Sequence, residues 1–550
     1  MGRVIEIVKE RKFKYICFFW IIISLQFVIG SNLQTKGYSI QGFQDAVISI
    51  LKVIFLSVIF IILHYSIMKL IEKIKKDKEH EELKEKSKKY NWLKYFLIIF
   101  VCWIPTLLAF YPAIISYDGG YQIRNCVFFG KIGTGNPILY TALLTFFYKL
   151  GAYGINSPNT GMFLFSIFQA LVMSLIFSYS VKFIEEESNN KWLKNATLIF
   201  YALFPYNQLF PIITTKDVLF AGFVILFIIN LYSILKKQRK IADYIYFIIL
   251  TVLMLLFRGN AIYAFVALIP FIILIKDKKI CIKLLSMFFI IIVLYQISNN
   301  VLIYLINEEK GENRAQLCVW SQAVGKICNE KQEELTEEEK EKISFYFEDY
   351  KEIGQVYKSN IADNTANMIN CENTYSNKAD FLKFMIQLGI KYPREFIDSF
   401  LNTIRGYWYI CDNSFNTIWH NERPYTMGAL ELYCLPIGIG KYAVLEESKI
   451  PKLKEFYQVM FCQNKYEEIP VLYILFQPAT YFYILIAYIL YSIYKRDKVG
   501  LLIGIYLFLY FLTCFLGPCS IIRYIYAVIV CVPIMACIVA KNEQKGEKET

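Results

Sequence analysis

Five short polar segments interrupt the long apolar stretches of this sequence, and they hold the residues best suited to chemistry. Their residue numbers are 116–122, 133–137, 214–217, 257–260 and 517–524. Each contains a charged or amide side chain next to apolar residues, and most contain glycine or proline. Ionisable groups at or inside a membrane boundary are costly and usually functional. If the segments meet on one side of a membrane, they form a single site.

A carboxylate among cations is suited to removing a proton from a hydroxyl beside a phosphate leaving group. We therefore expect a carboxylate of these segments, Asp118 or Asp217, to act as such a base. Lys216, Arg258 and Arg523 are assigned to the phosphate of a donor, whose charge they would neutralise. The neighbouring side chains are predicted to line the substrate pocket: Tyr117, Gln122, Asn136, Pro137, Asn260 and Tyr524.

Each of these residues also has an ordinary structural interpretation. Asp118 alone would be explained as a cap at the end of a loop. Lys216 and Asp217 are explained equally well as interface anchors whose long side chains reach for water. Arg258 and Arg523 would also suit non-specific contacts to lipid headgroups. The convergence of all five polar segments on one predicted side of the membrane favours a functional site over these separate explanations.

The elements that must position these residues are membrane helices. The chain has 550 residues, of which 56% are hydrophobic, 17% aromatic and only 19% charged. The apolar residues form blocks long enough to cross a hydrocarbon core of ~30 Å as helices. We predict an all-α polytopic fold with about 12 spans, near 14–31, 43–71, 94–115, 160–184, 195–212, 218–235, 241–257, 260–275, 283–306, 470–494, 499–516 and 521–540. Residues 137–152 are shorter and are predicted to form a re-entrant or interfacial helix.

Charge predicts the orientation. Residues 307–469 hold 26 acidic and 19 basic residues, so the remainder of the chain carries a net charge of +20. Excess lysine and arginine stay in the cytoplasm during insertion, which places the basic turns at 73–89, 236–240, 276–279 and 495–498, and both termini, on that side. The first apolar block is read as a retained helix and not a cleaved signal. We expect a bacterial cytoplasmic membrane protein surrounded by lipids, with no nucleic-acid partner.

The long loop 307–469 is predicted to form a small, mainly helical extracytoplasmic domain. Thr336 begins a capping box for a helix to about residue 350, and further helices at 378–391 and 394–409 meet at Pro393. The aromatic strip 407–409 is explained better by a membrane-interface belt than by a sugar platform. The domain holds six cysteines, and Cys318–Cys328 is a local disulfide candidate. The predicted divisions are 1–92, 93–306 with an outer catalytic loop at 116–152, 307–469 and 470–550.

The order of the polar segments resembles that of the GT-C glycosyltransferases, in the branch of the protein-mannosyl and aminoarabinose transferases. The segments that carry the resemblance are Tyr117-Asp118, residues 136–140 (NPILY) and residues 215–220 (TKDVLF). The sequence more closely resembles a bacterial group catalogued as domain of unknown function 6020, through these segments and through 321–324, 361–363, 392–393 and 406–408. The resemblance covers about residues 94–540. The resemblance implies that Asp118 and Asp217 are catalytic. Asp118 would be the catalytic acid or would hold a divalent metal ion (Mg or Mn), and Asp217 would be the second acid of the cavity.

The sequence departs from the GT-C pattern at three positions of these segments. Gly119 stands where the second acid of the loop pair is expected, Asn136 replaces a histidine, and Ile138 replaces a second proline. Gly259 stands where asparagine is commoner. Together these departures weaken the expectation of a metal ion that the resemblance raises.

The predicted function is transfer of a sugar from a polyprenyl-phosphate donor to a cell-envelope glycan, lipid or protein outside the membrane. Two other classes stay open. A transporter of lipid-linked sugar or polysaccharide predicts charges at mid-membrane and related halves. A non-catalytic membrane scaffold would need the outer domain alone and leaves the charged segments unexplained.

Overall fold

The structure is a computed structural model that describes residues 11–75, 91–236, 240–275, 277–306, 314–412, 437–438, 440–463 and 465–549. Within these ranges every regular element is a helix, and β contacts are confined to isolated bridges. Apolar segments adopt helices because a helix satisfies its own backbone hydrogen bonds where no water is present. The chain is therefore an all-α membrane protein, as the sequence predicts.

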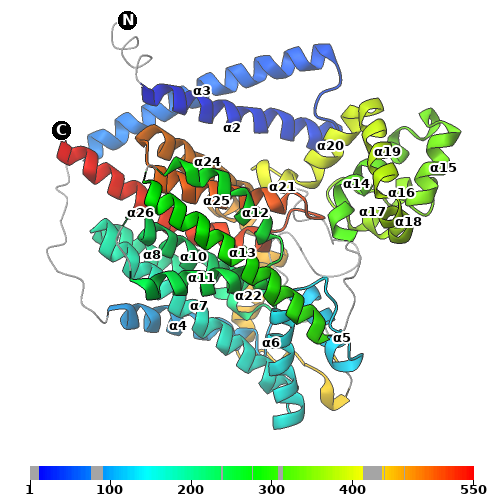
Figure 1. The fold of residues 1–550 in the computed structure, drawn as a ribbon. Coiled ribbons are helices and arrows are strands. Elements are labelled where there is room, and N and C mark those ends of the chain that lie inside the picture. Colours follow the sequence, from blue (N-terminus) through cyan, green and yellow to red (C-terminus); the bar gives the residue numbers. More distant parts are fainter. Residues whose placement is uncertain are drawn as a thin grey trace, which may run out of the picture.

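Long helices form a bundle with a separate group of shorter helices at one end (Figure 1). α10 and α26 lie at the centre of the bundle, whereas α3 is its least buried long helix. The bundle helices are α2 (Arg11–Lys36), α3 (Phe43–Lys75), α4 (Asn91–Ala109), α7 (Pro158–Ser188), α8 (Lys191–Leu203), α10 (Lys216–Lys236), α11 (Ile241–Phe257), α12 (Ala261–Ala267), α13 (Lys278–Ile306), α24 (Pro478–Lys495), α25 (Lys498–Cys514) and α26 (Tyr526–Glu549).

Eight helices of the described part are long and apolar enough to cross a membrane. Seven of them correspond to predicted spans, and an eighth, Ile138–Ile155, is the segment predicted to be interfacial. The predicted span 470–494 is a pair bent by 72°, α23 (Pro470–Phe476) and α24. Three more predicted spans are shorter apolar helices, and 195–212 is broken into α8, α9 (Pro205–Leu209) and the 3-10 turn Phe210–Ile212. The total of 12 spans stays a prediction.

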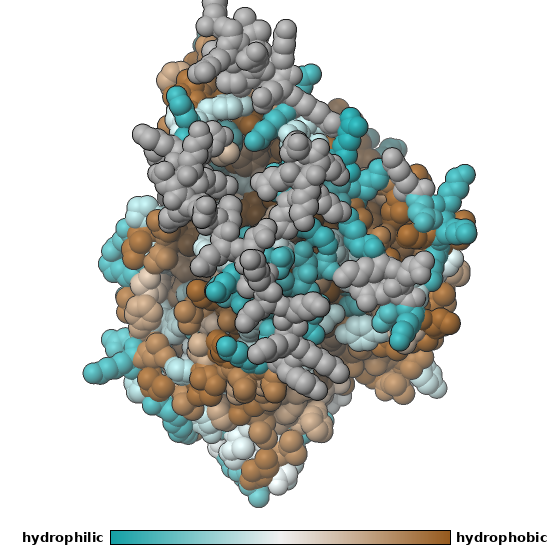
Figure 2. All heavy atoms as spheres, turned by 90° about the vertical axis from the view of Figure 1, so that its left-hand side faces the viewer, coloured by the Kyte–Doolittle hydropathy of each residue, from teal (hydrophilic) through white to brown (hydrophobic). Residues whose placement is uncertain are grey.

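Described residues beside two of the predicted basic turns, 236–240 and 495–498, lie together at one end of the bundle with the start of the C-terminal tail. At this end Lys236 lies 3.8 Å from Asp497, and Asn542 donates to Asp497 at 2.9 Å. Lys541 pairs with Glu187 at the same end. Figure 2 views this end and shows hydrophilic side chains gathered on it, with hydrophobic side chains on the flanks. The turn at 73–89 lies mostly outside the described residues.

α6 (Ile138–Lys149) and the π-helix Leu150–Ile155 form one apolar segment whose two ends lie at the opposite end of the bundle. α7 and α10 run parallel, because Met173 lies against Gly222 and Glu187 contacts Tyr232 further along both helices. The N-terminal ends of α7 and α10 therefore point toward the same end of the bundle, with α7 extending about 13 Å further. Asn136, just before α6, bonds Lys216 at the start of α10. The far end of the segment reaches Pro158, the start of α7.

The outer helices pack around their own apolar core, which extends from Leu317 to Phe396. They are α14 (Cys318–Glu330), α15 (Glu337–Tyr346), α16 (Tyr350–Val356), α17 (Asp363–Asn367), α18 (Cys371–Ser376), α19 (Lys378–Lys391) and α20 (Pro393–Thr403). The predicted capping box is present, since Thr336 and Glu339 bond each other's backbone N–H. The predicted helix 378–391 is confirmed, and the predicted helix 394–409 is divided at Ile404 into α20 and α21 (Arg405–Trp408). α22 (Pro451–Cys462) packs on the bundle, as do Ile437 and Val444 among the described residues before it.

The predicted Cys318–Cys328 disulfide is wrong. Both residues lie on the single helix α14, ten residues apart. At 1.5 Å per residue, they are separated by about 15 Å along the helix axis, far beyond the Cα separation that a disulfide spans. Both thiols are free and buried. Cys434 lies outside the described residues.

The hairpin of α2 and α3 reaches from the bundle to the outer helices. At its tip, the backbone N–H of Ser39 donates to Asp398 at 3.1 Å, and Lys326 donates to the carbonyl of Gly37 at 3.3 Å. Asp398 is fully buried and lies on α20. The N-terminal hairpin therefore anchors the outer helices from the side.

The placement of α6 predicts the accessibility of its two flanking loops. Epitope tags inserted after Gly133 and, in a second variant, after Asn156 should both be recognised from the outer surface of intact cells. The expectation follows because both loops lie at the end of the bundle opposite the basic turns. A tag after Lys498 serves as the control and should stay hidden until the cells are permeabilised. Recognition of only one of the two loops would mean that residues 138–155 cross the membrane.

Candidate functional site

Two chain segments about a hundred residues apart are joined where the site forms. The carbonyl of Ile114 accepts from the backbone N–H of Thr214 at 3.0 Å, and the N–H of Ile114 donates to Ile212 at 3.1 Å. Ser116 continues this contact, since its hydroxyl donates to the carbonyl of Thr214 at 2.6 Å. Each segment then starts a helix, α5 (Tyr117–Phe128) or α10. Asp118 and Lys216 are therefore brought side by side at two helix starts.

Gly119 makes this approach possible. A Cβ atom added at Gly119 would lie 2.3 Å from the Thr214 hydroxyl oxygen and 2.5 Å from its carbonyl oxygen. The first turn of α5 therefore rests directly on Thr214, and no side chain fits between them. This close approach accounts for the glycine at position 119. The same position cannot supply a second carboxylate in this protein.

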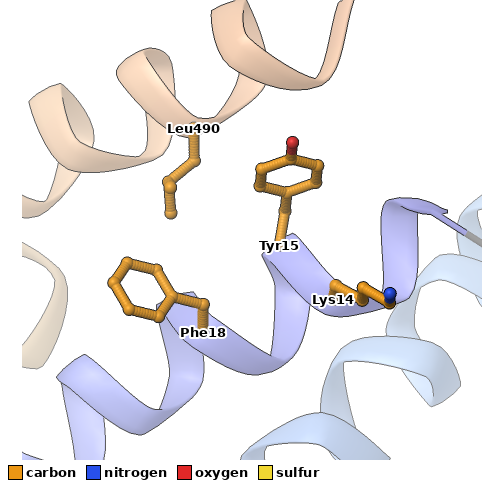
Figure 3. Close-up of a pocket in the computed structure, with 4 residues that line it drawn as sticks. All are labelled: Lys14, Tyr15, Phe18 and Leu490. Carbon is orange, nitrogen blue, oxygen red and sulfur yellow. The ribbon is translucent and has the colours of Figure 1, made fainter.

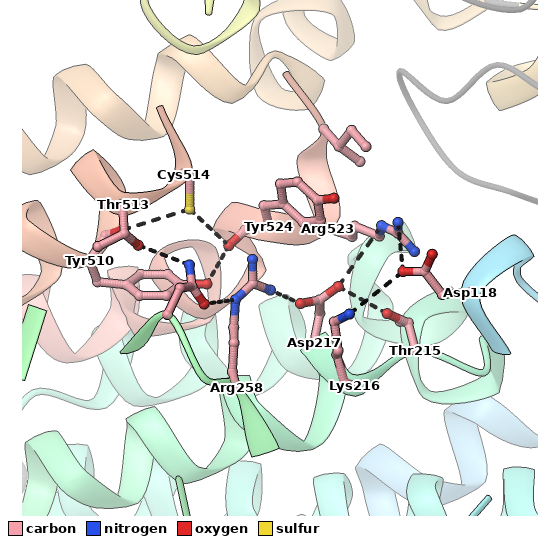
Figure 4. Close-up of polar contacts among 12 residues, drawn as sticks. Asp118, Thr215, Lys216, Asp217, Arg258, Tyr510, Thr513, Cys514, Arg523 and Tyr524 are labelled. Atoms are coloured by element: carbon pink, nitrogen blue, oxygen red, sulfur yellow. Dashed lines mark hydrogen bonds and ion pairs between the residues drawn. The ribbon is translucent and has the colours of Figure 1, made fainter. Parts of the chain in front are cut away.

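The predicted charged residues form one continuous chain of opposite charges (Figure 4). Asp118 Oδ2 lies 3.1 Å from Arg523 Nη2 and 3.7 Å from Lys216 Nζ. Arg523 Nε lies 3.9 Å from Asp217 Oδ2, and Arg258 is in direct contact with the other oxygen of Asp217. We call these five residues the charge cluster. Sequence reasoning predicted all five, and the structure brings them together.

Exposure increases along the cluster from Asp217 to Asp118. The side chain of Asp217 is 1% exposed and that of Asp118 is 27% exposed. Lys216 is intermediate at 17%. Asp217 also accepts from the Thr215 hydroxyl at 2.9 Å, so both of its oxygens are engaged. Asp118 is therefore the carboxylate that an incoming molecule can reach, and Asp217 lies behind it.

Asp118 is held in its ionised form. Burial by itself would raise the pKa of the Asp118 carboxyl, but the positive charges of Arg523, Lys216 and Arg258 outweigh this effect and keep the pKa below its usual value. The cluster contains three cations and two carboxylates, so it carries one surplus positive charge. It is thus prepared to accept an anion.

Aromatic rings and amides hold the two arginines in place. The Arg258 guanidinium lies 4.9 Å from the ring of Tyr524 and 5.7 Å from those of Phe220 and Tyr510. The ring of Tyr524 also lies 5.3 Å from the guanidinium of Arg523. Such contacts favour a cation on a ring face.

Asn260 belongs to the same support. Its amide oxygen accepts from Arg258 Nε at 2.9 Å, and its amide nitrogen donates to Thr513 at 3.0 Å. Tyr524 and Asn260, predicted as pocket residues, therefore contact arginine side chains of the cluster.

The remaining predicted pocket residues occupy three different environments. Asn136 accepts a hydrogen bond from Lys216 Nζ at 2.6 Å, and Pro137 follows it as the residue that precedes α6. Gln122 is buried between α5 and α6, where it accepts from Thr141. Tyr117 is 58% exposed, and its ring stacks on that of Tyr121 at 6.4 Å. Asn136 thus has a direct hydrogen bond to a member of the charge cluster.

Sequence reasoning missed Asp363, which the outer helices bring toward the cluster. The N–H of Ala362 donates to the carbonyl of Pro518 at 2.7 Å, and Ile361 forms an antiparallel bridge with Cys519. Burial and then the negative charge of Asp118 raise the pKa of the Asp363 carboxyl, and Arg523 opposes them. The segment 361–363 contributed to the family resemblance. That is the only signal that would have identified Asp363 from the sequence.

Tyr407 holds the loop that leads to Arg523. Its side chain is fully buried, and its hydroxyl accepts from the N–H of Ile521 at 2.9 Å. Tyr409 is buried against Gly30 of α2, and Trp408 donates to the carbonyl of Leu401. The interpretation of 407–409 as an aromatic interface belt is therefore wrong. Their hydroxyl and indole N–H groups find partners inside the protein.

The residues around Asp118 are a poor match for a divalent metal ion. Asp118 is already paired with two cations, and Gly119 leaves no room for a second acid beside it. In the described part of the chain no three acidic, histidine or cysteine side chains are grouped as a metal site requires. Magnesium and manganese prefer several oxygen ligands. The positive charges of the cluster are those of Lys216, Arg258 and Arg523.

A cavity of about 580 Å³ lies elsewhere, between α2 and α24 (Figure 3). It is lined by Lys14, Tyr15, Phe18 and Leu490. Lys14 is near the start of α2, whereas the end of α2 leads to the outer helices. The cavity is thus remote from the charge cluster and is not the candidate site.

The chain matches a family described as "Family of unknown function (DUF6020)" over residues 130–550. The matched region begins after Asp118 and includes the other four members of the charge cluster. It also includes all the described outer helices. No curated protein and no solved structure matches the chain.

The burial of the ion pair between Asp217 and Arg258 predicts how substitutions in the cluster change the stability of the protein. Asp217→Asn should lower the free energy of unfolding by about 3–5 kcal/mol, because it leaves buried cations without their counter-charge. Adding Arg258→Met in the same chain should restore most of the loss. The measurement is the melting temperature of the full-length protein in detergent. Glu468→Gln, which breaks an exposed pair with Lys465, is the control and should change little. Equal stability of the single and double variants would contradict the assignment.

The raised pKa of Asp363 predicts that replacing this residue stabilises the protein at neutral pH, whereas replacing Asp217 destabilises it. A carboxyl whose pKa is raised in the folded state stabilises the protein below its ordinary pKa of about 4 and loses this contribution as the pH rises through the raised value. Asp363→Asn should therefore raise the melting temperature at pH 7, by on the order of a degree, and match the wild type at pH 4.

Asp349→Asn is the control for this experiment, because Asp349 caps α16 in the same group of helices. Its substitution should not stabilise the protein at pH 7. A destabilising Asp363→Asn at pH 7 would mean that Asp363 is held in its ionised form.

Proposed function

The chain belongs to the DUF6020 family of unknown function, and we propose that it is a membrane glycosyltransferase of the GT-C type. It would transfer a sugar from a polyprenyl-phosphate donor to a cell-envelope glycan, lipid or protein. The reaction would take place at the extracytoplasmic face of a bacterial cytoplasmic membrane. In this proposal the chain crosses that membrane about 12 times, with both termini in the cytoplasm.

The observation that carries the proposal is the partly exposed carboxylate of Asp118 held between Lys216 and Arg523. The three cations of the cluster exceed its two carboxylates by one charge. A lipid-linked phosphate would neutralise that surplus. The cluster lies at the start of α10, about 30 Å from the basic turn at its other end, which is the thickness of a hydrocarbon core. A lipid carrier would bring its headgroup to this depth.

The proposed step is a single displacement at the anomeric carbon of the donor. The acceptor hydroxyl attacks this carbon while its proton passes to Asp118. A new bond forms between the anomeric carbon and the acceptor oxygen, and the bond to the phosphate oxygen breaks. The electron pair leaves with the polyprenyl phosphate, whose developing charge Lys216 and Arg523 stabilise. Because attack and departure occur on opposite faces, the configuration inverts.

Donor binding would itself strengthen Asp118 as a base. Without a donor, the cations keep the pKa of Asp118 low, and a carboxylate with a low pKa accepts a proton poorly. A bound phosphate shares the same cations and weakens their hold on Asp118. The pKa of Asp118 then rises when the substrate is in place. This coupling would restrict proton removal to the complex that contains the donor.

Asp217 has a supporting role in this proposal. It is almost fully buried and pairs with Arg258 and Arg523. From this position it fixes the arginine side chains, and it does not contact the acceptor. The prediction that Asp217 is catalytic is thus refined to a positioning role.

Asp118→Asn is expected to lower transfer by about 10²–10⁴-fold, the usual contribution of a general base, without loss of expression. Membranes that contain the full-length protein are incubated with a panel of polyprenyl-phosphate sugars. The measured product is free polyprenyl phosphate, which appears whatever the acceptor is. Asp243→Asn is the control, because Asp243 caps the far end of α11 and should leave the rate unchanged.

The outcomes of this experiment separate the three classes of function. Near-normal release by Asp118→Asn would discard the catalytic assignment. A transporter would move the lipid-linked sugar without releasing polyprenyl phosphate. A scaffold would do neither.

A further inference from the structure

The buried phenol of Tyr140 carries a further inference about the same site. Tyr140 lies in the first turn of α6, four residues after Asn136, whose amide oxygen bonds Lys216. This bond holds the start of α6 against the charge cluster. The aromatic ring is fixed as well, because it packs edge-on against Phe165 at 6.3 Å and Phe257 at 6.4 Å. Phe257 directly precedes Arg258 in the chain.

The hydroxyl of Tyr140 has no hydrogen-bond partner in the described part of the protein, although its side chain is fully buried. A buried hydroxyl without a partner is costly, and most buried polar groups are bonded. Phenylalanine would occupy the same apolar surroundings without that cost. A tyrosine at this position therefore points to a partner that binds from outside the chain.

The surroundings of the hydroxyl indicate what that partner is. The hydroxyl interacts electrostatically with Asp118 and with Arg523, the two residues at the exposed end of the cluster. Tyr357 also has an unbonded buried hydroxyl, but its charged neighbours are Glu330, Asp398 and Arg405, outside the cluster. Of these two tyrosines, only Tyr140 has its unbonded hydroxyl near the charge cluster.

We propose that the Tyr140 hydroxyl donates a hydrogen bond to a phosphate oxygen of the donor, beside Asp118, Lys216 and Arg523. This assignment rests on the function proposed above. A phenol is a neutral donor that binds an anion without adding charge to the cluster. A hydrogen bond to an ionised oxygen is stronger than one to a neutral group. Tyr140 is thus a positioning residue that orients the phosphate relative to Asp118.

The experiment measures phosphate binding directly, without transfer. Full-length protein in detergent is titrated with farnesyl phosphate and, separately, with farnesol, which has the same tail and no phosphate. Tyr140→Phe should weaken farnesyl phosphate binding about tenfold, equivalent to ~1.4 kcal/mol, and leave the farnesol affinity unchanged. Its melting temperature without ligand should equal or exceed that of the wild type, since no internal hydrogen bond is lost.

Tyr148→Phe is the matched control. Tyr148 is also fully buried on α6, but its hydroxyl donates to the carbonyl of Tyr442 at 2.7 Å. This variant should lower the melting temperature and keep the wild-type affinity for farnesyl phosphate. Such a result would separate loss of a structural hydrogen bond from loss of a ligand contact.

Each outcome bears on a different claim. Wild-type affinity of Tyr140→Phe for farnesyl phosphate, or an equal loss for farnesol, would overturn the role of Tyr140 and leave the proposed function standing. If the wild-type protein does not bind farnesyl phosphate more tightly than farnesol, the proposed function fails, and the role of Tyr140 fails with it.

Discussion

The alternating charges of Arg258, Asp217, Arg523, Asp118 and Lys216 are the interaction on which this end of the protein depends. Each buried ion needs its counter-ion, because an unpaired charge in a low-dielectric interior is far costlier than a pair. The members come from four segments spread over about 400 residues. Those segments must meet for any of the charges to be tolerated. The cluster therefore fixes the relative positions of α5, α10, the turn after α11 and the start of α26.

This requirement accounts for the irregular backbone around the cluster. The chain turns at Arg258 between α11 and α12, and Arg523 lies in a 3-10 turn, Ile522–Ile525, before α26. Non-helical backbone at membrane depth is tolerated only where protein buries it or water reaches it. Here the rings of Tyr510 and Tyr524 lie against Arg258. The hydroxyl of Tyr407 bonds the backbone of the loop that precedes Arg523. In the proposed function, cations fixed in this way before a substrate arrives would need little reorientation to bind it.

The membrane helices and the membership of the cluster could be predicted because both leave local signals. A long apolar block predicts a membrane helix from its composition alone, and a charged residue at the edge of such a block is easy to recognise in the sequence. The break in 195–212, the bend in 470–494 and the role of Tyr407 left no such signal, since they depend on packing partners far away in the chain. Asp363 looked like an ordinary acid of a surface domain. The Cys318–Cys328 pairing was proposed from spacing alone and failed because α14 is continuous.

The outer helices are attached to the rest of the molecule at two separate places. The tip of the α2–α3 hairpin bonds Asp398 and Lys326, and the loop at Pro518 and Cys519 bonds residues 361 and 362. A rigid group fastened on two sides cannot swing away as a hinged cover without breaking both attachments. Movement of the loop at Pro518 and Cys519 would also displace Arg523, which follows this loop in the chain. In the proposed function, the outer helices would stay in place during the reaction, and an acceptor would approach Asp118 beside the exposed rings of Tyr117 and Tyr121.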